Sequence, residues 1–166
     1  AWLASAGLLG APAMAAELDQ ASSLKIEVHG TVTERCAISS PGDVNLGNLN
    51  QAGRHTELKF GLDCNVPFNM TVAAERGALA NREFPLGQGP YAGSLPYQFD
   101  LSIPVRKPSS STVTRSFKSS DLVGGGQSFS SGGGIATQGM DARVTLGRAG
   151  GIAGLLGGDY SETINI

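Results

Sequence analysis

The stretch that decides the fold reads Leu24-Lys25-Ile26-Glu27-Val28-His29-Gly30-Thr31-Val32. Apolar and polar residues alternate strictly along it, and a period of two is typical of a half-buried β-strand. The apolar side carries one exception, Gly30. A glycine weakens an ordinary strand because it packs nothing, but it lets another backbone or a shallow pocket floor come close. The alternation therefore predicts a notched strand that fits a groove, either in its own domain or in another molecule.

Short alternating runs punctuated by turns continue to the end of the chain. The predicted strands and short apolar segments cover residues 24–38, 44–49, 56–66, 68–72, 97–105, 112–117, 140–146 and 159–166. We expect Pro104 to end the strand that contains it, and most of 106–134 to be an exposed Ser/Gly-rich loop. No amphipathic helix stands out after residue 24. Several short strands at turn spacing predict an all-β sandwich.

The composition bounds the class of protein. A chain of 166 residues has room for one domain of ordinary size. Its net charge of −2 argues against nucleic acid as a partner, because phosphate binding needs a basic patch. The 24 glycines and the small charged fraction of 16% suit an extracellular β-protein with many turns, and they do not suit a helical bundle.

The first residues read as part of a secretory signal. Residues 1–10 are apolar and uncharged, and Ala13-Met14-Ala15 has the small-x-small pattern of a cleavage site. The run is too short to span a bilayer. A short amphipathic helix or a disordered tail is the alternative. We expect residues 1–15 to be a partial signal peptide and the mature protein to begin at Ala16, outside the cytoplasm.

Cys36 and Cys64 are the only two cysteines. In a small secreted domain an even count usually means a disulfide. Closing a loop of roughly 29 residues stabilises a fold by about 3.6 kcal/mol in the chain-entropy model. The alternatives are a zinc site, which lacks CxxC spacing and a nearby His pair, and a reactive thiol, for which Arg35 is slim support.

No motif in the chain carries catalytic chemistry. The glycine runs lack the Gly-Lys-Ser/Thr of a phosphate loop. His29 and His55 are far apart and no nucleophile motif accompanies them. Solvated strand faces are the default for the scattered carboxylates, which include Asp63, Asp100, Asp141 and Glu162. We therefore expect that the protein is not an enzyme, that it has no catalytic or metal-binding residue and that it uses no cofactor.

The class of function that remains is assembly into a larger structure, and several segments of the chain resemble a family of that class. The relevant segments are Cys36-Ala37-Ile38, Val44-Asn45-Leu46-Gly47-Asn48-Leu49, Leu58-Lys59-Phe60-Gly61-Leu62-Asp63-Cys64 and the closing Gly158-Asp159-Tyr160-Ser161-Glu162-Thr163-Ile164-Asn165-Ile166. With the N-terminal alternating strand, they resemble the spore coat protein U domain, the pilin domain of archaic (Csu-type) chaperone–usher pili. The resemblance covers roughly residues 22–66 and the last ten residues, and it is poor in the middle.

The resemblance implies an immunoglobulin-like β-sandwich over 34–166 that lacks its last strand, preceded by a donor-strand extension over 16–33. A periplasmic chaperone would lend a strand, and at the outer-membrane usher the next subunit's extension would replace it. The chain's end at Ile166, with no further strand, agrees with this expectation. The implied donor residues are Leu24, Ile26, Val28, Gly30 and Val32. The implied acceptor groove is lined by Tyr160, Ile164 and Ile166, and Cys36 and Cys64 would tie the first two strands.

The expected function is therefore a secreted structural subunit of a surface pilus, of the kind that serves cell adhesion and biofilm formation. It would reach the cell surface through the periplasm and polymerise with neighbouring subunits. Two alternative functions would use the same strand and groove. One is a receptor-binding tip subunit of such an assembly. The other is a self-complemented secreted coat protein, in which residues 24–32 fold back into their own groove.

Overall fold

The structure is a computed structural model that describes residues 25–40 and 42–166. The described residues belong to two units that divide between Val32 and Thr33. The second unit contains eleven strands and one 3₁₀ helix, η1. Their bounds are β1 Cys36–Ser39, β2 His55–Cys64, β3 Asn69–Ala74, β4 Leu79–Asn81, β5 Ser94–Leu95, β6 Tyr97–Lys107, β7 Ser109–Lys118, η1 Ser119–Leu122, β8 Gln127–Ser130, β9 Met140–Leu146, β10 Tyr160–Ser161 and β11 Ile164–Asn165. The prediction of an all-β fold is confirmed.

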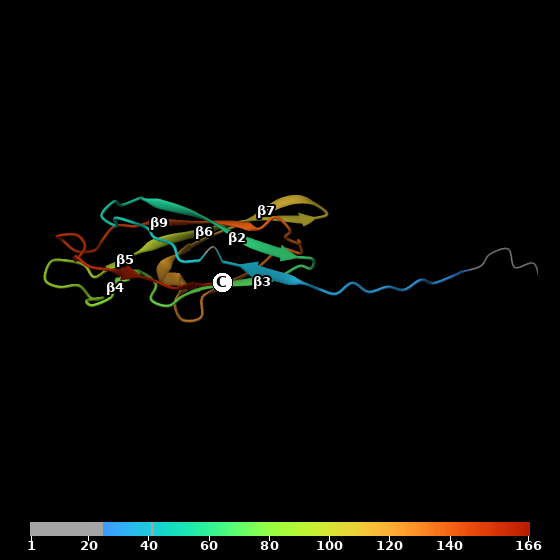
Figure 1. The fold of residues 1–166 in the computed structure, drawn as a ribbon, viewed down its shortest axis with the longest axis horizontal. Coiled ribbons are helices and arrows are strands. Elements are labelled where there is room, and N and C mark those ends of the chain that lie inside the picture. Colours follow the sequence, from blue (N-terminus) through green and yellow to red (C-terminus); the bar gives the residue numbers. More distant parts are fainter. Residues whose placement is uncertain (1–24, 41) are drawn as a thin grey trace, which may run out of the picture. The chain divides into compact units, whose positions relative to one another are not determined.

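The strands form antiparallel sheets, an arrangement consistent with a β-sandwich. The largest sheet has the order β1-β2-β9-β6-β7, and two smaller sheets have the orders β10-β4-β5 and β11-β3-β8. Figure 1 shows β2, β9, β6 and β7 in one layer and β3, β4 and β5 in the other. The chain crosses repeatedly between the layers, so strands distant in sequence become neighbours.

The core lies between the layers and follows the alternation of the long strands. In β6 and β9 every second residue is buried. The largest fully buried side chains include Phe99, Ile103 and Val72. Because successive side chains point to opposite faces of a strand, this pattern places one face of each long strand on the core. The strands predicted near 56–66, 68–72, 97–105 and 140–146 are confirmed within a few residues.

Two local predictions are wrong. Residues 44–49 form no strand and lie in a loop. Pro104 does not end its strand, since β6 runs on to Lys107. The N–H of Arg106 donates to the Ile135 carbonyl, away from β7, so the nitrogen of Pro104 also faces away from β7. Pairing with β9 ends at Ser102, and the missing N–H of the proline therefore breaks no hydrogen bond of either ladder.

The region 106–134 is also more regular than predicted. The short strand expected at 112–117 extends over all of β7, and η1 and β8 follow it. Only Val113 and Phe117 of β7 are half-buried. The remaining Ser, Thr and charged residues carry no hydrophobic signal, but the backbone still pairs with β6 from end to end. Edge pairing through the main chain left too little trace in the sequence to be predicted.

The final strand predicted over 159–166 is divided in two. β10 pairs with β4, whereas β11 pairs with β3 in another sheet. At the interruption the Glu162 carboxylate accepts hydrogen bonds from the backbone N–H groups of Arg76 and Ala78, in the turn that joins β3 to β4. The carboxylate thus replaces the missing ladder bonds with side-chain ones.

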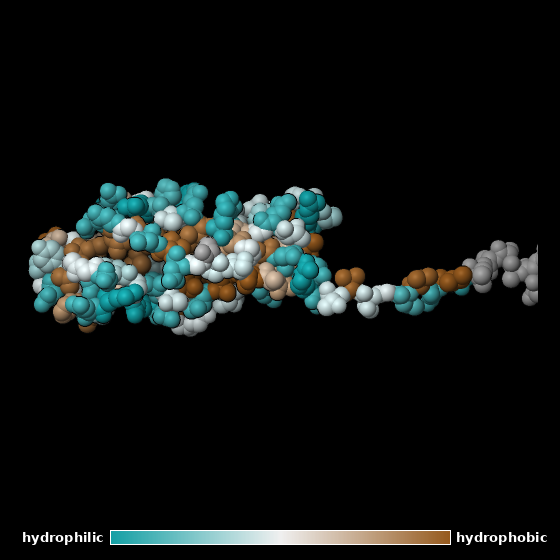
Figure 2. All heavy atoms as spheres, in the orientation of Figure 1, coloured by the Kyte–Doolittle hydropathy of each residue, from teal (hydrophilic) through white to brown (hydrophobic). Residues whose placement is uncertain are grey.

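The other unit contributes only residues 25–32 to the described structure. None of them has strand pairing, and all are exposed. The apolar residues, and Gly30 with them, still alternate with Lys25, Glu27, His29 and Thr31, and Figure 2 shows hydrophobic and hydrophilic atoms on opposite sides of this segment. The predicted signal 1–15 and residues 16–24 of the predicted extension 16–33, Leu24 among them, lie outside the described residues.

Candidate functional site

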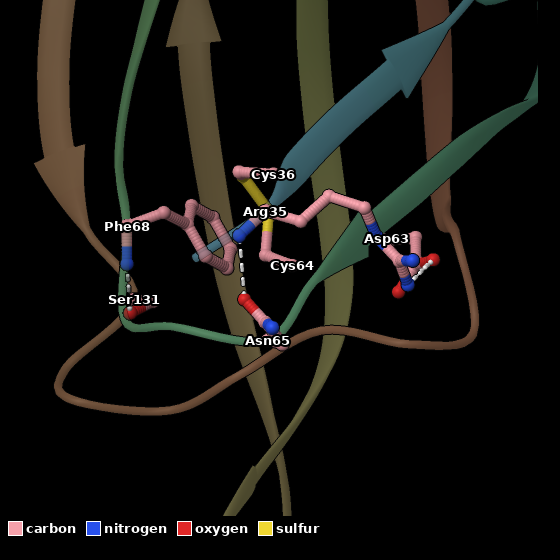
Figure 3. Close-up of a disulfide and its surroundings, with 7 residues drawn as sticks. All are labelled: Arg35, Cys36, Asp63, Cys64, Asn65, Phe68 and Ser131. Carbon is pink, nitrogen blue, oxygen red and sulfur yellow. Dashed lines mark hydrogen bonds and ion pairs between the residues drawn. A yellow bond between two sulfur atoms is a disulfide. The ribbon is translucent and has the colours of Figure 1, made fainter. Parts of the chain in front are cut away.

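The predicted disulfide between Cys36 and Cys64 is present. The two residues lie directly opposite each other where β1 pairs with β2. Next to the bond, the backbone N–H of Arg35 donates to the side-chain oxygen of Asn65 over 2.7 Å, and its guanidinium lies 2.6 Å from Asp63 (Figure 3). The side-chain amide of Asn65 also donates to the Thr33 carbonyl. Together these contacts fix the start of β1 at the edge of the five-stranded sheet.

A long open groove lies between that edge and the final residues of the chain, with a volume of about 1340 Å³. The three residues predicted to line an acceptor groove, Tyr160, Ile164 and Ile166, all line it. Figure 2 shows hydrophobic atoms exposed between the two layers of the domain. The structure thus brings the predicted residues together in one concave surface, which polar and apolar residues line together.

The floor of the groove is the incompletely covered core. Leu58 and Phe60 of β2 point to the core but remain half-buried, whereas Leu62 and Cys64, further along the same strand, are buried. The other half-buried apolar residues of the lining are Leu46, Leu49, Leu155, Leu156, Tyr160, Ile164 and Ile166. Sequence reasoning missed Leu155, because it lies in a glycine-rich loop without periodicity.

The strands on both sides of the groove are sheet edges. β1 is the last strand of the five-stranded sheet, and β10 and β11 are the last strands of the two smaller sheets. Within residues 25–40 and 42–166, none of these three strands pairs with a second neighbour. An unpaired edge offers a row of free N–H and C=O groups to an incoming strand. The groove therefore combines an apolar floor with two hydrogen-bonding edges.

The final segment is held firmly in position. The Tyr160 hydroxyl donates to the Leu156 carbonyl over 2.7 Å, and β10 pairs with the buried Asn81. The guanidinium of Arg76 donates to the backbone carbonyl and hydroxyl of Ser161. These bonds hold the backbone of the final segment in place, so this wall of the groove has a defined shape.

One polar atom in the lining lacks a partner. Tyr97, at the start of β6, is only 4% exposed, and its hydroxyl makes no hydrogen bond. Burial, and secondarily the negative charge of Glu162, raise the pKa of Tyr97 above its ordinary value. The alternation over 97–105 puts Tyr97 on the same face of β6 as the buried Phe99, but it carries no information about the hydrogen bonding of the Tyr97 hydroxyl.

The predicted donor residues that the structure describes are highly exposed: Ile26 by 72%, Val28 by 89% and Val32 by 85%. Gly30 needs no glycine for its own backbone, because its φ is not positive and an added Cβ would meet no atom within 4 Å. Large exposed apolar side chains on one side of a segment are typical of an interaction surface. The donor role itself is a prediction that the structure leaves untested.

Three of the carboxylates weighed for chemistry, Asp63, Asp100 and Asp141, lie on the faces of their strands that point away from the core, whereas Glu162 lines the groove. Asp63 pairs with Arg35 and Asp141 with Lys59, while Asp100 accepts hydrogen bonds from Gln98 and Ser116. In the described part of the chain, no group of three His, Cys, Asp or Glu residues is arranged to hold a metal ion. No helix among the described residues is long and apolar enough to cross a membrane.

No protein-family model, no curated protein and no solved structure matches this chain significantly.

Proposed function

We propose that this protein is a secreted structural subunit of a surface pilus that polymerises by donor-strand exchange. In this proposal the sandwich is immunoglobulin-like and lacks one strand, and the groove is the place of that strand. The occupant is the segment around residues 25–32 of a second copy, or the equivalent segment of another subunit. Each copy would accept a strand in its groove and donate its own to the next.

The proposal rests on a match between two features of one chain. One is the groove with its half-buried apolar floor, and the other is an apolar stripe, the side of residues 24–32 that carries Leu24, Ile26, Val28, Gly30 and Val32. The groove has two unpaired edges and a half-buried floor. The stripe has exposed apolar residues at a period of two and no pairing of its own. A strand laid in the groove would pair with an edge through its backbone and bury alternate side chains, as in β-strand addition.

The energetics favour a durable contact. Burying the four apolar side chains of the stripe would contribute on the order of 6–12 kcal/mol before ordering costs are subtracted. A row of backbone hydrogen bonds adds to this, and the strand must leave cooperatively. A large barrier to withdrawal would make the assembly kinetically stable.

The route to the cell surface rests on the resemblance to archaic chaperone–usher pilins alone. On that analogy a periplasmic chaperone covers the groove until assembly, and an outer-membrane usher supplies the place of exchange. The groove gives a physical reason for such a partner. An exposed apolar surface bordered by unpaired strand edges promotes aggregation unless something covers it.

The experiment is to express the mature chain in the periplasm with and without residues 16–33 and to analyse it unboiled in detergent. The proposal predicts a heat-sensitive ladder of multimers that disappears when the extension is removed. The point variant Val28→Asp keeps the full chain and serves as a second test, with far-UV circular dichroism to check folding. A stable monomer of the unaltered chain that does not exchange with added partner would favour self-complementation instead.

A further inference from the structure

We infer that Arg115 keeps a second seam of the sandwich closed to an added strand, so that copies associate only through the groove. The second seam is the border between the two layers where the edge strands β7 and β8 meet. The inference rests on the proposed function, because it takes strand addition as the way in which copies associate. It adds the residue that makes this seam exclude a strand while the groove accepts one.

The second seam has the same kind of unpaired edges as the groove. β7 is the last strand of the five-stranded sheet, and β8 is the last strand of the β11-β3-β8 sheet. β7 pairs with β6 over its whole length. Within residues 25–40 and 42–166, neither β7 nor β8 pairs with a second neighbour. Because a long exposed edge strand is a template for pairing with another chain, some feature of this seam must prevent such pairing.

Arg115 lies on the core-facing side of β7. Val113 and Phe117, two residues away on either side, are half-buried and pack against the core. In the ladder with β6, Arg115 is directly opposite the buried Leu101. Since side chains alternate between the faces of a strand, Arg115 shares the face of Val113 and Phe117. A charged residue therefore stands where the alternation would place an apolar one, and inward-pointing charges are a known protection of edge strands.

The side chain of Arg115 reaches across the seam to β8. Its guanidinium carbon Cζ lies 5.2 Å from the centre of the Phe129 ring. Phe129 also contacts Phe117, with 6.1 Å between the ring centres. A guanidinium over an aromatic face is a favourable cation–π contact, and the aliphatic stem of an arginine covers apolar surface. Arg115 thus covers the apolar side chains at the seam and leaves its charge at the surface.

The charge of Arg115 makes strand addition at β7 unfavourable. Arg115 is exposed, and its guanidinium donates a hydrogen bond to the backbone carbonyl of Thr114 over 2.8 Å. In the described part of the chain, no carboxylate forms an ion pair with it. A strand added along β7 would remove water from this unpaired charge, which costs free energy. At the groove, the core-facing residues Leu58 and Phe60 of β2 carry no charge, so an added strand there meets no such cost.

The test uses the full chain carrying both Val28→Asp and Ile164→Asp, which disable the stripe and the groove; this chain is the parent. We expect Arg115→Val in the parent to raise the association constant between copies by about tenfold or more, because the cost of burying the charge is removed. Lys118→Val is the matched control, since it removes the same charge from the outer face of the same strand. It should change the association constant by less than about twofold. Arg115→Lys keeps the charge and should also stay near the parent.

Sedimentation equilibrium measures the association, and circular dichroism checks that each variant is folded. Amide hydrogen exchange locates the contact: residues 109–118 should exchange more slowly in the Arg115→Val multimers than in the parent. Association of Arg115→Val equal to that of the parent, an equal rise in Lys118→Val or Arg115→Lys, or a rise without protection of 109–118 would overturn the inference. Each comparison is made with the parent and decides the inference whether or not the parent is monomeric. Multimers of the parent itself would contradict the proposed function instead.

Discussion

Residues 24–32 and strand β2 have nearly the same sequence pattern and very different surroundings. Both alternate apolar residues with polar residues or glycine, and each has one exception on its apolar side, Gly30 in the first and Thr56 in β2. β2 pairs with β1 on one side and with β9 on the other, whereas the described residues 25–32 pair with nothing and are exposed. Alternation indicates which side chains can be buried, but it does not indicate which surface they pack against.

The difference within β2 makes the same point. Leu62 and Cys64 are buried because residues of both layers cover them, but Leu58 and Phe60 remain half-buried where the groove lies. The segment 25–32 therefore has apolar side chains with nothing packed against them, and the core-facing side of β2 is only partly covered at the groove. In the proposed exchange, one strand would bury both sets of side chains.

The largest effect is expected from a charge in the stripe. Val28→Asp would place a carboxylate on the apolar floor, and we expect assembly to fall by roughly 100-fold or more, because burying an unpaired charge costs several kcal/mol. His29→Asp introduces the same charge on the polar side of the segment and is the matched control. The amount of multimer in unboiled samples is the measurement. Equal losses for both variants would show that the two sides of the segment are not distinguished.

The disulfide joins β1, one wall of the groove, to the well-paired β2. Replacing both cysteines (Cys36→Ser with Cys64→Ser) should lower the free energy of unfolding by about 3–4 kcal/mol, as expected for a loop of this length. Urea unfolding of the oxidised wild type and of the double variant measures the difference. The reduced wild type is the control for the serine side chains. A loss below about 1 kcal/mol would show that β1 is held in place without the bond.

A pH effect is expected from Tyr97, in the lining that β6 contributes. Its pKa is raised in the folded chain, so the neutral hydroxyl is favoured by folding. This contribution is fully present below the unfolded pKa, near 10.0, and is lost as the pH rises from there toward the folded pKa. Unfolding free energies between pH 9 and 11 should therefore fall less steeply in Tyr97→Phe than in wild type, by up to about 1.4 kcal/mol per pH unit. Parallel slopes would contradict the burial of this hydroxyl.

The smallest effect is expected at the surface beside the disulfide. Arg35, in the segment before β1, and Asp63, in β2, form a close but exposed ion pair. Arg35→Ala should cost about 0.2–1 kcal/mol at low salt, and less at high salt because exposed charges are screened. Thermal unfolding at two salt concentrations is the check, with Lys59→Ala at the Asp141 pair as a comparison. A loss that is independent of salt would point to packing of the arginine stem instead.

The sequence predicted the class of fold, because long alternating strands such as β6 and β9 carry a strong periodic signal. Of the residues that line the groove it named only Tyr160, Ile164 and Ile166, and it named them from the family resemblance. It did not predict β7 in full, since an edge strand rich in Ser and Thr pairs through its backbone. It also treated residues 159–166 as one strand. The division depends on the Glu162 carboxylate reaching backbone groups more than 80 residues away, and no local pattern encodes such a contact.

The central claim is that stripe and groove act between copies, and one mixing experiment tests it most directly. One full chain carries Val28→Asp, which disables donation, and a differently tagged full chain carries Ile164→Asp, which disables acceptance. Each variant, shown by circular dichroism to be folded, should be monomeric alone. The account predicts that mixing them yields a heat-sensitive dimer containing one copy of each tag. If both variants stay monomeric after mixing while the unaltered chain forms multimers, the exchange does not use this stripe and this groove.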